Sequence, residues 1–400
     1  MADPRAVQSP SLRFDFLTPA RVVFGWGRRK ELGPLARSLG QRAFVVSGSK
    51  SLERSGVVAQ IQALLEEAGL TVCLLATLGH EPLVADVDAA VERILEFAPR
   101  PGDFVVALGG GSAIDLAKAV AALATNRHGH GVTDFLEGVG KGLKIEKPPL
   151  PVLAIPTTAG TGSEATKNSV ISSTEPAYKK SLRSELMVPR IVMIDPELTV
   201  GLPPEITAHT GMDAITQLIE SYISRRAQPI PQALSESGLR LALRSIETAV
   251  KDGSNRLARE GMAYAAFLSG VALANSGLGL AHGVAAALGI HCHVAHGLAC
   301  AVMLPAALRV NRDIRQSELA RLWSLVDPQT VADEKEAADR FIAHIDELTH
   351  RIGIPSRLSQ IGVTRDQIPA LIKGSRGNSM DGNPRDVGDE ELRDLLERLL

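Results

Sequence analysis

The secondary-structure signals in this chain change at about residue 200, and that change limits the folds open to it. Before that point, short runs rich in valine, isoleucine and leucine alternate with segments of helical periodicity. Strands are expected at residues 42–49 and 71–78 and from residue 103, and helices at 56–70 and 84–98. Strands that alternate with helices imply a mostly parallel sheet covered on both faces.

After residue 200, only helical periodicity remains. Long stretches such as 233–252, 255–288 and 335–354 repeat apolar residues every three or four positions. The aromatic fraction is only 4%, which suits close-packed helices and parallel strands. The sequence therefore predicts an α/β domain over residues 1–200 and an all-helical domain over residues 201–400.

Charge, hydropathy and cysteine content exclude several classes of protein. A net charge of -2 argues against a nucleic-acid or acidic-membrane partner. No apolar run reaches the roughly 18 residues of a membrane-spanning helix, and the N-terminus lacks the apolar core of a signal peptide. We therefore expect a cytoplasmic protein without a membrane partner, with a loose tail at residues 1–12. The three cysteines Cys73, Cys292 and Cys300 make no disulfide framework.

Two loops of small residues each follow a predicted strand. The first, Gly109-Gly110-Gly111-Ser112, also opens a helix, so its backbone N–H groups can approach a pyrophosphate at the positive end of that helix. The second loop, residues 156–164, offers the hydroxyl groups of Thr157, Thr158, Thr161 and Ser163. One glycine turn alone is a weak signal, but two such loops at the edge where open α/β sheets bind ligands favour a nucleotide site.

The turn after the strand at 42–49 bears on the choice of nucleotide. An acidic residue there would bind a ribose 2′-hydroxyl and repel a 2′-phosphate. The chain instead has Gly48, Ser49 and Lys50, and Lys50 could pair with a phosphate. NADP is therefore permitted and NAD is not excluded.

Four of the ten histidines, His282, His291, His293 and His296, lie within one short stretch of an otherwise His-poor chain. Imidazole is a common metal ligand and a general acid or base. On one straight helix His282 and His296 would lie roughly 21 Å apart, so shared ligation requires the chain to turn between them. Gly289 is the expected break, with a second helix beginning near His296. The alternative is a buried apolar helix with hydrogen-bonded histidines.

A carboxylate for such a metal is present in the segment Thr210–Gln217. Asp213 and Gln217 are four residues apart and share one face of a helix. Taken alone, Asp213 could instead mark a helix start, and Gln217 could be a polar side chain between helices. Cys292 and Cys300 flank the histidine cluster and could also ligate a metal, although packing residues are the simpler interpretation.

The motifs GGGSAIDLAKAVA, PTTAGTGSE, IDPELTVGLPP, TGMDAITQLIES, GLAHGVAAALG and HVAHGLA occur here in one order and spacing. In these motifs, residues 15–400 resemble the iron-containing (group III) alcohol dehydrogenases. The resemblance implies a Rossmann-like N-terminal domain, a helical C-terminal domain, and the architecture shared with dehydroquinate synthase. It places NAD or NADP and a divalent metal in the cleft between the domains. The implied metal ligands are Asp213, His282 and His296, and the implied cofactor contacts are Gly110, Gly111, Ser112, Thr157, Thr158, Thr161 and Lys180.

Two positions depart from the pattern of that family. Gln217 stands where typical iron enzymes have a histidine ligand, and Ala286 stands where many have another histidine. Gln217 could still ligate through its amide oxygen, and His209 is a further candidate. Zinc-binding glycerol dehydrogenases of the same superfamily use an Asp-His-His set, so the metal is expected to be iron or zinc.

The function implied by the resemblance is a metal-dependent, NAD(P)-linked alcohol dehydrogenase or aldehyde reductase. It would act on a small alcohol or carbonyl compound and assemble as a homo-oligomer, a dimer or larger. Since Ala286 cannot relay the departing proton, His293 or His291 is the candidate. Three alternatives stay open: a maleylacetate reductase, a sugar-phosphate cyclase resembling dehydroquinate synthase, and an inactive relative kept as a binding protein.

Overall fold

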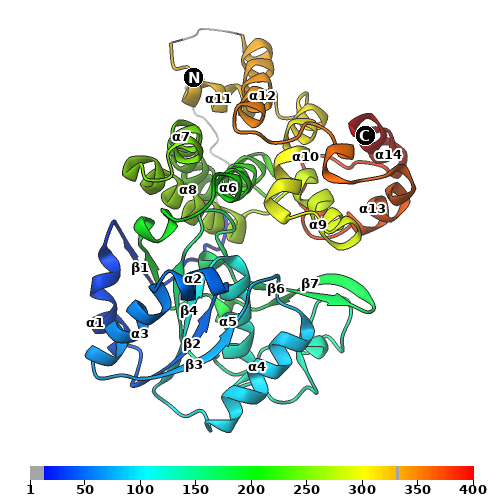
Figure 1. Ribbon diagram of the computed structural model, residues 1–400. Helices are drawn as coiled ribbons and strands as arrows, with labels where there is room; N and C mark the ends of the chain where they lie inside the picture. The colour runs from blue at the N-terminus through cyan, green and yellow to red at the C-terminus, as the bar shows by residue number, and fades with distance from the viewer. Residues whose placement is uncertain (1–12, 330–332) are drawn as a thin grey trace, which may run out of the picture.

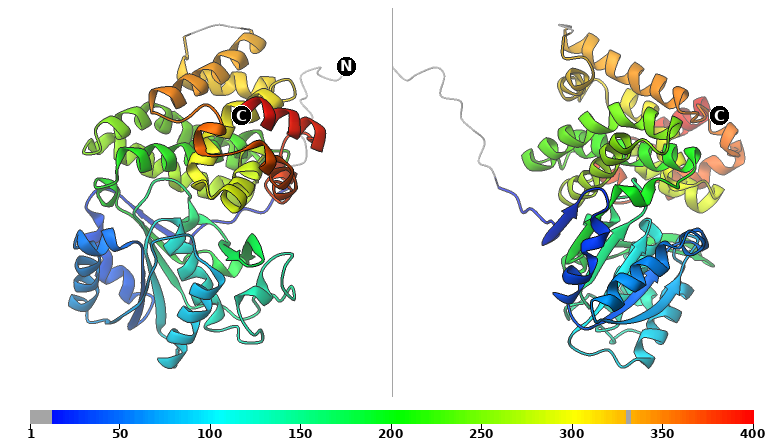
Figure 2. Two further views of the ribbon diagram at one scale, coloured as in Figure 1. Left: turned by 45° about the vertical axis from the view of Figure 1, so that its right-hand side comes forward. Right: turned by 60° about the vertical axis from the view of Figure 1, so that its left-hand side comes forward.

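The structure is a computed structural model that describes residues 13–329 and 333–400. It has an N-terminal domain built on a parallel sheet and a C-terminal domain made of helices (Figure 1). Two further views show the helical domain lying against one end of the sheet domain (Figure 2). The tail predicted at residues 1–12 lies outside the described residues.

The sheet has six strands in the order β1-β8-β5-β4-β2-β3, and every pair is parallel, which confirms the predicted parallel sheet. Its strands are β1 Arg21–Phe24, β2 Arg42–Ser47, β3 Thr71–Thr77, β4 Asp103–Gly109, β5 Val152–Pro156 and β8 Ile191–Ile194. The register pairs Ser47 with Leu108 and Gly109 with Pro156. The carboxyl ends of β2, β4 and β5 therefore meet at one edge, and the two predicted loops leave from that edge.

Helices cover both faces of this sheet. Ala43 and Val45 of β2 face a buried cluster shared with α1 and α3, while Phe44 and Val46 face one shared with α4 and α5. This alternation is the two-residue period of a strand buried on both sides. The helices of the domain are α1 Leu32–Arg37, α2 Lys50–Arg54, α3 Val57–Glu67, α4 Val84–Glu96 and α5 Gly111–Leu123.

A two-stranded hairpin, absent from the sequence prediction, lies between β5 and β8. Its antiparallel strands are β6 Asn168–Thr174 and β7 Ala177–Arg183. Most of its side chains are polar and only partly buried, so it lacks the apolar run that marks the strands of the main sheet. Figure 1 shows it beneath α9, at the boundary between the two domains.

The C-terminal domain packs its helices around one large apolar cluster. They are α6 Pro204–Ile223, α7 Pro229–Lys251, α8 Arg256–Asn275, α9 Leu280–Cys292, α10 His296–Asn311, α11 Gln316–Val326, α12 Glu334–Arg351, α13 Ile368–Gly374 and α14 Asp389–Leu399. Helix α6 begins at Pro204, a residue suited to the first turn of a helix. Asp213 therefore lies in mid-helix and does not mark a helix start.

The chain does turn between His282 and His296, but the predicted break at Gly289 is wrong. Helix α9 continues through Gly289 to Cys292 and ends at His293, whose φ of 55° is left-handed. The N–H of Val294 then donates to the carbonyl of Leu288 at 3.3 Å, which closes the helix end. A glycine permits a helix break but does not require one. The next helix begins at His296, as expected.

The two domains approach each other backbone to backbone at Gly270. A Cβ added to Gly270 of α8 would lie 2.2 Å from the carbonyl oxygen of Gly162, which belongs to the loop after β5. Only glycine fits at such a distance.

Among the described helices, none is by itself long and apolar enough to cross a bilayer. Helices α8 and α9 meet the criteria of length and composition only as a pair, and they are bent by 100° at their junction.

Candidate metal and nucleotide site

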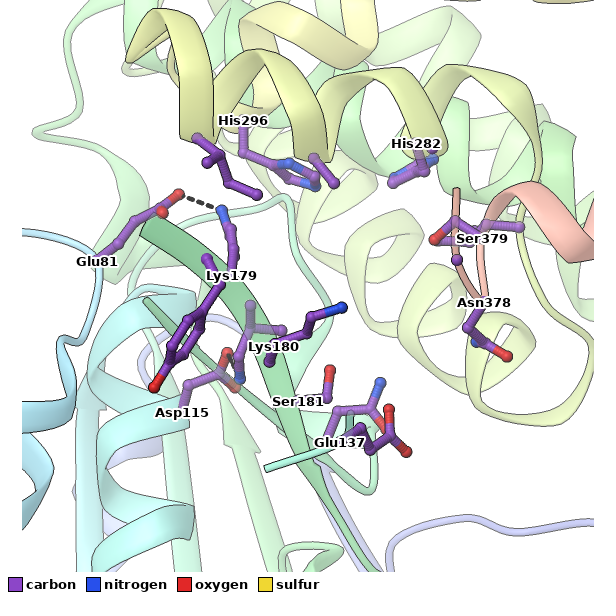
Figure 3. A pocket seen from close by; sticks show the side chains of 18 of the residues that line it. Glu81, Asp115, Glu137, Lys179, Lys180, Ser181, His282, His296, Asn378 and Ser379 are labelled. Atoms are coloured by element: carbon purple, nitrogen blue, oxygen red, sulfur yellow. Dashed lines mark hydrogen bonds and ion pairs between the residues drawn. The ribbon is translucent and has the colours of Figure 1, made fainter. Parts of the chain in front are cut away.

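Three predicted metal ligands converge from three helices of the C-terminal domain. Asp213 lies on α6, His282 on the first turn of α9, and His296 on the first residue of α10. The Oδ1 of Asp213 is 3.3 Å from Nε2 of His282 and 3.8 Å from Nε2 of His296. Both histidines point into a pocket between the domains (Figure 3).

Glu220, on the same helix as Asp213, fixes the ring of His282. Its Oε2 accepts a hydrogen bond from Nδ1 of His282 at 2.7 Å. The same carboxylate accepts the backbone N–H groups of Gly279, Ala281 and His282 at the start of α9. Since Glu220 binds Nδ1, the ring presents Nε2 to Asp213 and His296, the arrangement of a carboxylate that orients a metal-binding histidine.

The donor set fits a cation. Nε2 of His282 is buried and has no hydrogen-bond partner among the described residues, although it lies beside a buried carboxylate. Burial opposes the charged form of His282, but Cys300, Asp213 and Glu220 together raise its pKa well above the ordinary value. Burial and the charges of Lys179 and His282 lower the pKa of His296 to about 4, so His296 is neutral and free to ligate. A metal ion would take the place of the proton that these groups otherwise share.

Gln217 lies beside this cluster in a defined hydrogen-bond chain. Its Nε2 donates to Oδ1 of Asp213 at 3.3 Å, and its Oε1 accepts from Oγ of Ser269 at 2.7 Å. Ser269 belongs to α8, next to the contact between Gly270 and Gly162.

Cys300 also lies at the cluster. The four residues that could share one ion, among those described, are Asp213, His282, His296 and Cys300, with ligand atoms within 4.8 Å of one another. His209 is not in this group. Sγ of Cys300 is 3.7 Å from Nε2 of His296, and without a metal, burial raises the pKa of this thiol to about 12. The spacing of four residues from His296 was the available sequence signal, because it puts both side chains on one helix face.

The pocket has a volume of about 680 Å³ and is lined by both domains. On its C-terminal wall lie His282, His296, Gln217 and the predicted relay residue His291, while His293 is not a lining residue of the described pocket. Asn378 and Ser379, from the segment before α14, also line the pocket (Figure 3). Sequence reasoning gave no signal for these two residues.

The N-terminal wall brings the two predicted nucleotide loops together. A Cβ on Gly110 would lie 3.1 Å from Oγ1 of Thr158, and one on Gly111 would lie 2.6 Å from Oγ1 of Thr161. The predicted cofactor residues that line the pocket are Gly111, Ser112, Thr161, Ser163 and Lys180. The structure does not place the other predicted ones in this lining; they end or follow the strands β2, β4 and β5 at the same sheet edge, and they are Gly48, Ser49, Lys50, Gly109, Gly110, Thr157 and Thr158.

The hairpin contributes charged residues to the same wall. Lys179 of β7 donates to Oε1 of Glu81 at 2.6 Å, and its charge acts on His296 (Figure 3). Lys180 projects from the same strand into the pocket. The unpredicted hairpin thus places two lysines between the nucleotide loops and the histidines.

Comparison with known proteins places both domains in one family. Residues 19–196 match the family model described as iron-containing alcohol dehydrogenase, and residues 207–400 match that of the Fe-containing alcohol dehydrogenase family, C-terminal.

Individual relatives agree with these matches. The chain is similar to long-chain-alcohol dehydrogenase 1 of Geobacillus thermodenitrificans, with 35% identity over 89% of this chain and 90% of the relative. Its fold is similar to that of a 1,3-propanediol oxidoreductase, with a TM-score of 0.89, 32% identity and coverage of 97% and 100%. It is also similar to a sulfoacetaldehyde reductase from Bifidobacterium kashiwanohense in complex with NAD+, with a TM-score of 0.85, 30% identity and coverage of 97% and 99%.

Proposed function

The chain belongs to the iron-containing alcohol dehydrogenase family and is an oxidoreductase, and on this premise we propose that it transfers hydride between NAD(P) and a small alcohol or aldehyde at a divalent metal. The observation that carries the proposal is Nε2 of His282, which Glu220 orients towards Asp213 and His296 in a pocket shared with the predicted nucleotide loops. The relatives named above are dehydrogenases or reductases, which favours hydride transfer over cyclase chemistry.

Asp213, His282 and His296 would hold the metal. A divalent metal bound there supplies Lewis acidity, which favours the alkoxide form of an alcohol and polarises a carbonyl. Glu220 keeps the proton of His282 on Nδ1, so that Nε2 stays a donor to the metal. Since Asp213 and Glu220 lie on one helix, the ring between them has a fixed orientation.

The N-terminal domain would hold the nicotinamide cofactor, which carries the hydride chemistry. Gly110 and Gly111 open the 13-residue helix α5, whose backbone N–H groups and positive end suit a pyrophosphate. A side chain at Gly111 would collide with Thr161, and one at Gly110 would be in tight contact with Thr158. Lys180 adds a positive charge on the pocket wall, and NAD and NADP are both compatible with Ser49 and Lys50 at the turn after β2.

A proton leaves when an alcohol is oxidised, and His291 is the better candidate to accept it. His291 lies in the last turn of α9 and lines the pocket, whereas His293 ends that helix in the left-handed conformation. We therefore propose Nε2 of His291 as the atom that accepts the proton. This nitrogen lies next to Gly374, since a Cβ added to that glycine would be 3.0 Å from it.

The proposed function is tested by metal content and turnover together. Protein purified without added metal is analysed by mass spectrometry, reconstituted with iron or zinc, and assayed for NAD(P)H formation with a panel of alcohols. About one equivalent of metal and metal-restored activity are expected. Asp213→Ala, His282→Ala and His296→Ala should each lose most metal and activity, while the exposed His350→Ala should keep both.

Full turnover by the metal-free protein would refute the metal-dependent mechanism and favour chemistry of the maleylacetate reductase type. Metal binding without turnover of any nicotinamide cofactor would instead refute the hydride transfer.

A further inference from the structure

We propose that Cys300 is the fourth protein ligand of the metal, as a thiolate, and that Gln217 stays outside the ligand set. The inference rests on the proposed metal-dependent function and specifies its coordination. The ligand atoms would be Oδ1 of Asp213, Nε2 of His282, Nε2 of His296 and Sγ of Cys300.

Three distances between these atoms lie near the edges of one coordination tetrahedron, and all four atoms lie within 4.8 Å of one another. With metal–nitrogen and metal–oxygen bonds of about 2.0–2.1 Å and a metal–sulfur bond of about 2.3 Å, the edges are roughly 3.3 Å between N or O atoms and roughly 3.6 Å to sulfur. The structure has 3.3 Å from Asp213 to His282, 3.8 Å from Asp213 to His296, and 3.7 Å from His296 to Cys300. Small movements of these side chains would therefore bring all four atoms to an ion.

The position of Cys300 suits a ligand. It lies one helical turn after His296 on α10, and its side chain is fully buried. Nε2 of His282 has no hydrogen-bond partner among the described residues, so a second buried donor atom is aimed at the same point. A thiol that only filled space would be expected to face apolar side chains rather than a carboxylate and two imidazoles.

Gln217 is held in another role. To ligate, its Oε1 would have to leave Ser269, from which it accepts a 2.7 Å hydrogen bond. The amide nitrogen, which faces Asp213, has no lone pair to offer a metal. Gln217 therefore completes the hydrogen bonds of Asp213 from outside the metal.

A divalent ion removes the proton from a thiol that coordinates it, so Cys300 would bind as the thiolate. When the metal binds, the S–H bond of Cys300 breaks, a metal–sulfur bond forms, and the proton leaves to water; no electrons are transferred. A soft sulfur donor shifts the preference of the site towards zinc.

A four-residue ligand set still leaves room for substrate. Asp213 and Cys300 lie on the buried side of the cluster, whereas His282 and His296 line the pocket. A substrate oxygen would approach from the pocket as a fifth ligand.

X-ray absorption of the zinc-loaded protein tests this inference without any measurement of activity. The expected spectrum has one sulfur scatterer at about 2.3 Å and the remaining ligands as nitrogen or oxygen at about 2.0–2.2 Å. Cobalt-loaded protein should show a thiolate-to-metal charge-transfer band in the near ultraviolet. Cys300→Ser should lose the sulfur shell and the band, and weaken zinc binding by at least about tenfold. Cys292→Ser, the same exchange eight residues earlier, and Gln217→Ala should keep both signals.

Bound zinc with only nitrogen and oxygen ligands in the unmodified protein would overturn the assignment of Cys300 and leave the proposed function standing. A sulfur signal that survives in Cys300→Ser would also overturn it. If the unmodified protein binds no metal at all, the inference and the metal-dependent proposed function both fail.

Discussion

Exchange of Glu220 for glutamine would test two roles of its carboxylate, which caps the start of α9 and orients the ring of His282. Glu220 is 2% exposed, and its two oxygens accept four hydrogen bonds from α9: three backbone N–H groups and Nδ1 of His282. Glutamine keeps the shape but has only one acceptor oxygen and no charge. If that oxygen takes the place of Oε2, the new NH₂ group faces the N–H of Ala281, which donates to Oε1 at 2.7 Å.

The free energy of unfolding should fall by about 1–5 kcal/mol. A buried donor left without a partner costs about 1–3 kcal/mol, and loss of a negative charge at a helix N-terminus costs about 0.3–1 kcal/mol, or up to about 2 kcal/mol in a partly buried site. Metal affinity should also fall, by about 10–100-fold, because His282 loses the charged partner that orients its ring. That decrease corresponds to about 1.4–2.7 kcal/mol of binding free energy.

Two assays measure these effects independently. Denaturant unfolding of the metal-free protein gives the stability, and competition with a coloured chelator gives the zinc dissociation constant. Glu236→Gln is the matched control, since its carboxylate accepts hydrogen bonds from Tyr222 and Arg321 on the same domain and does not contact His282. A Glu220→Gln protein that is less stable yet binds zinc within about twofold of the unmodified protein would show that Glu220 only caps α9. The orientation of His282 would then need another explanation.

Three further predictions use other parts of the structure. Burial raises the pKa of Glu164 to about 7, so the folded chain holds the carboxyl proton more tightly than the unfolded chain does. Relative to Glu164→Gln, the unmodified protein should therefore lose up to about 3 kcal/mol of stability between pH 4.5 and 8. Denaturant unfolding at several pH values measures this loss, and parallel pH curves for the two proteins would contradict it. Gly270→Ala should lower stability by at least about 1–3 kcal/mol because its methyl group would overlap the carbonyl of Gly162; Gly201→Ala, with open space around it, should not, and equal melting temperatures would refute the contact. Ser49→Asp should shift the ratio of kcat/KM towards NAD over NADP by at least about tenfold, and an unaltered ratio would mean that the turn after β2 does not reach the ribose.

The sequence was sufficient for the main sheet because its strands are short apolar runs, and β2, β4 and β5 are followed by small residues. Phe44 and Val46 on one face of β2 and Val45 on the other are all buried, and such a strand reads as continuously apolar. The β6–β7 hairpin lacks this pattern, since residues such as Lys179 and Lys180 are polar and half-buried. Hairpins of this kind are specified by their contacts with other parts of the chain.

The candidate site was predictable only where residues carry recognisable chemistry. Asp213, His282 and His296 stand out by type and spacing, but the contact of Cys300 with Asp213 depends on how α10 packs against α6. Glu220 lies seven residues after Asp213, on the same helix face, yet its partner is the N-terminus of α9, about sixty residues away along the chain. The break at His293 rather than Gly289 likewise depends on a backbone conformation that residue type does not dictate.

The contact between Gly162 and Gly270 has a consequence for how the cleft opens. It joins the backbone of the nucleotide loop to α8, and the adjacent Ser269 is linked through Gln217 to Asp213. A rotation of one domain against the other would therefore pivot near this point, and groups close to the pivot would move least. Asp213, which is linked to this contact through Gln217 and Ser269, would therefore keep its place relative to the loop after β5.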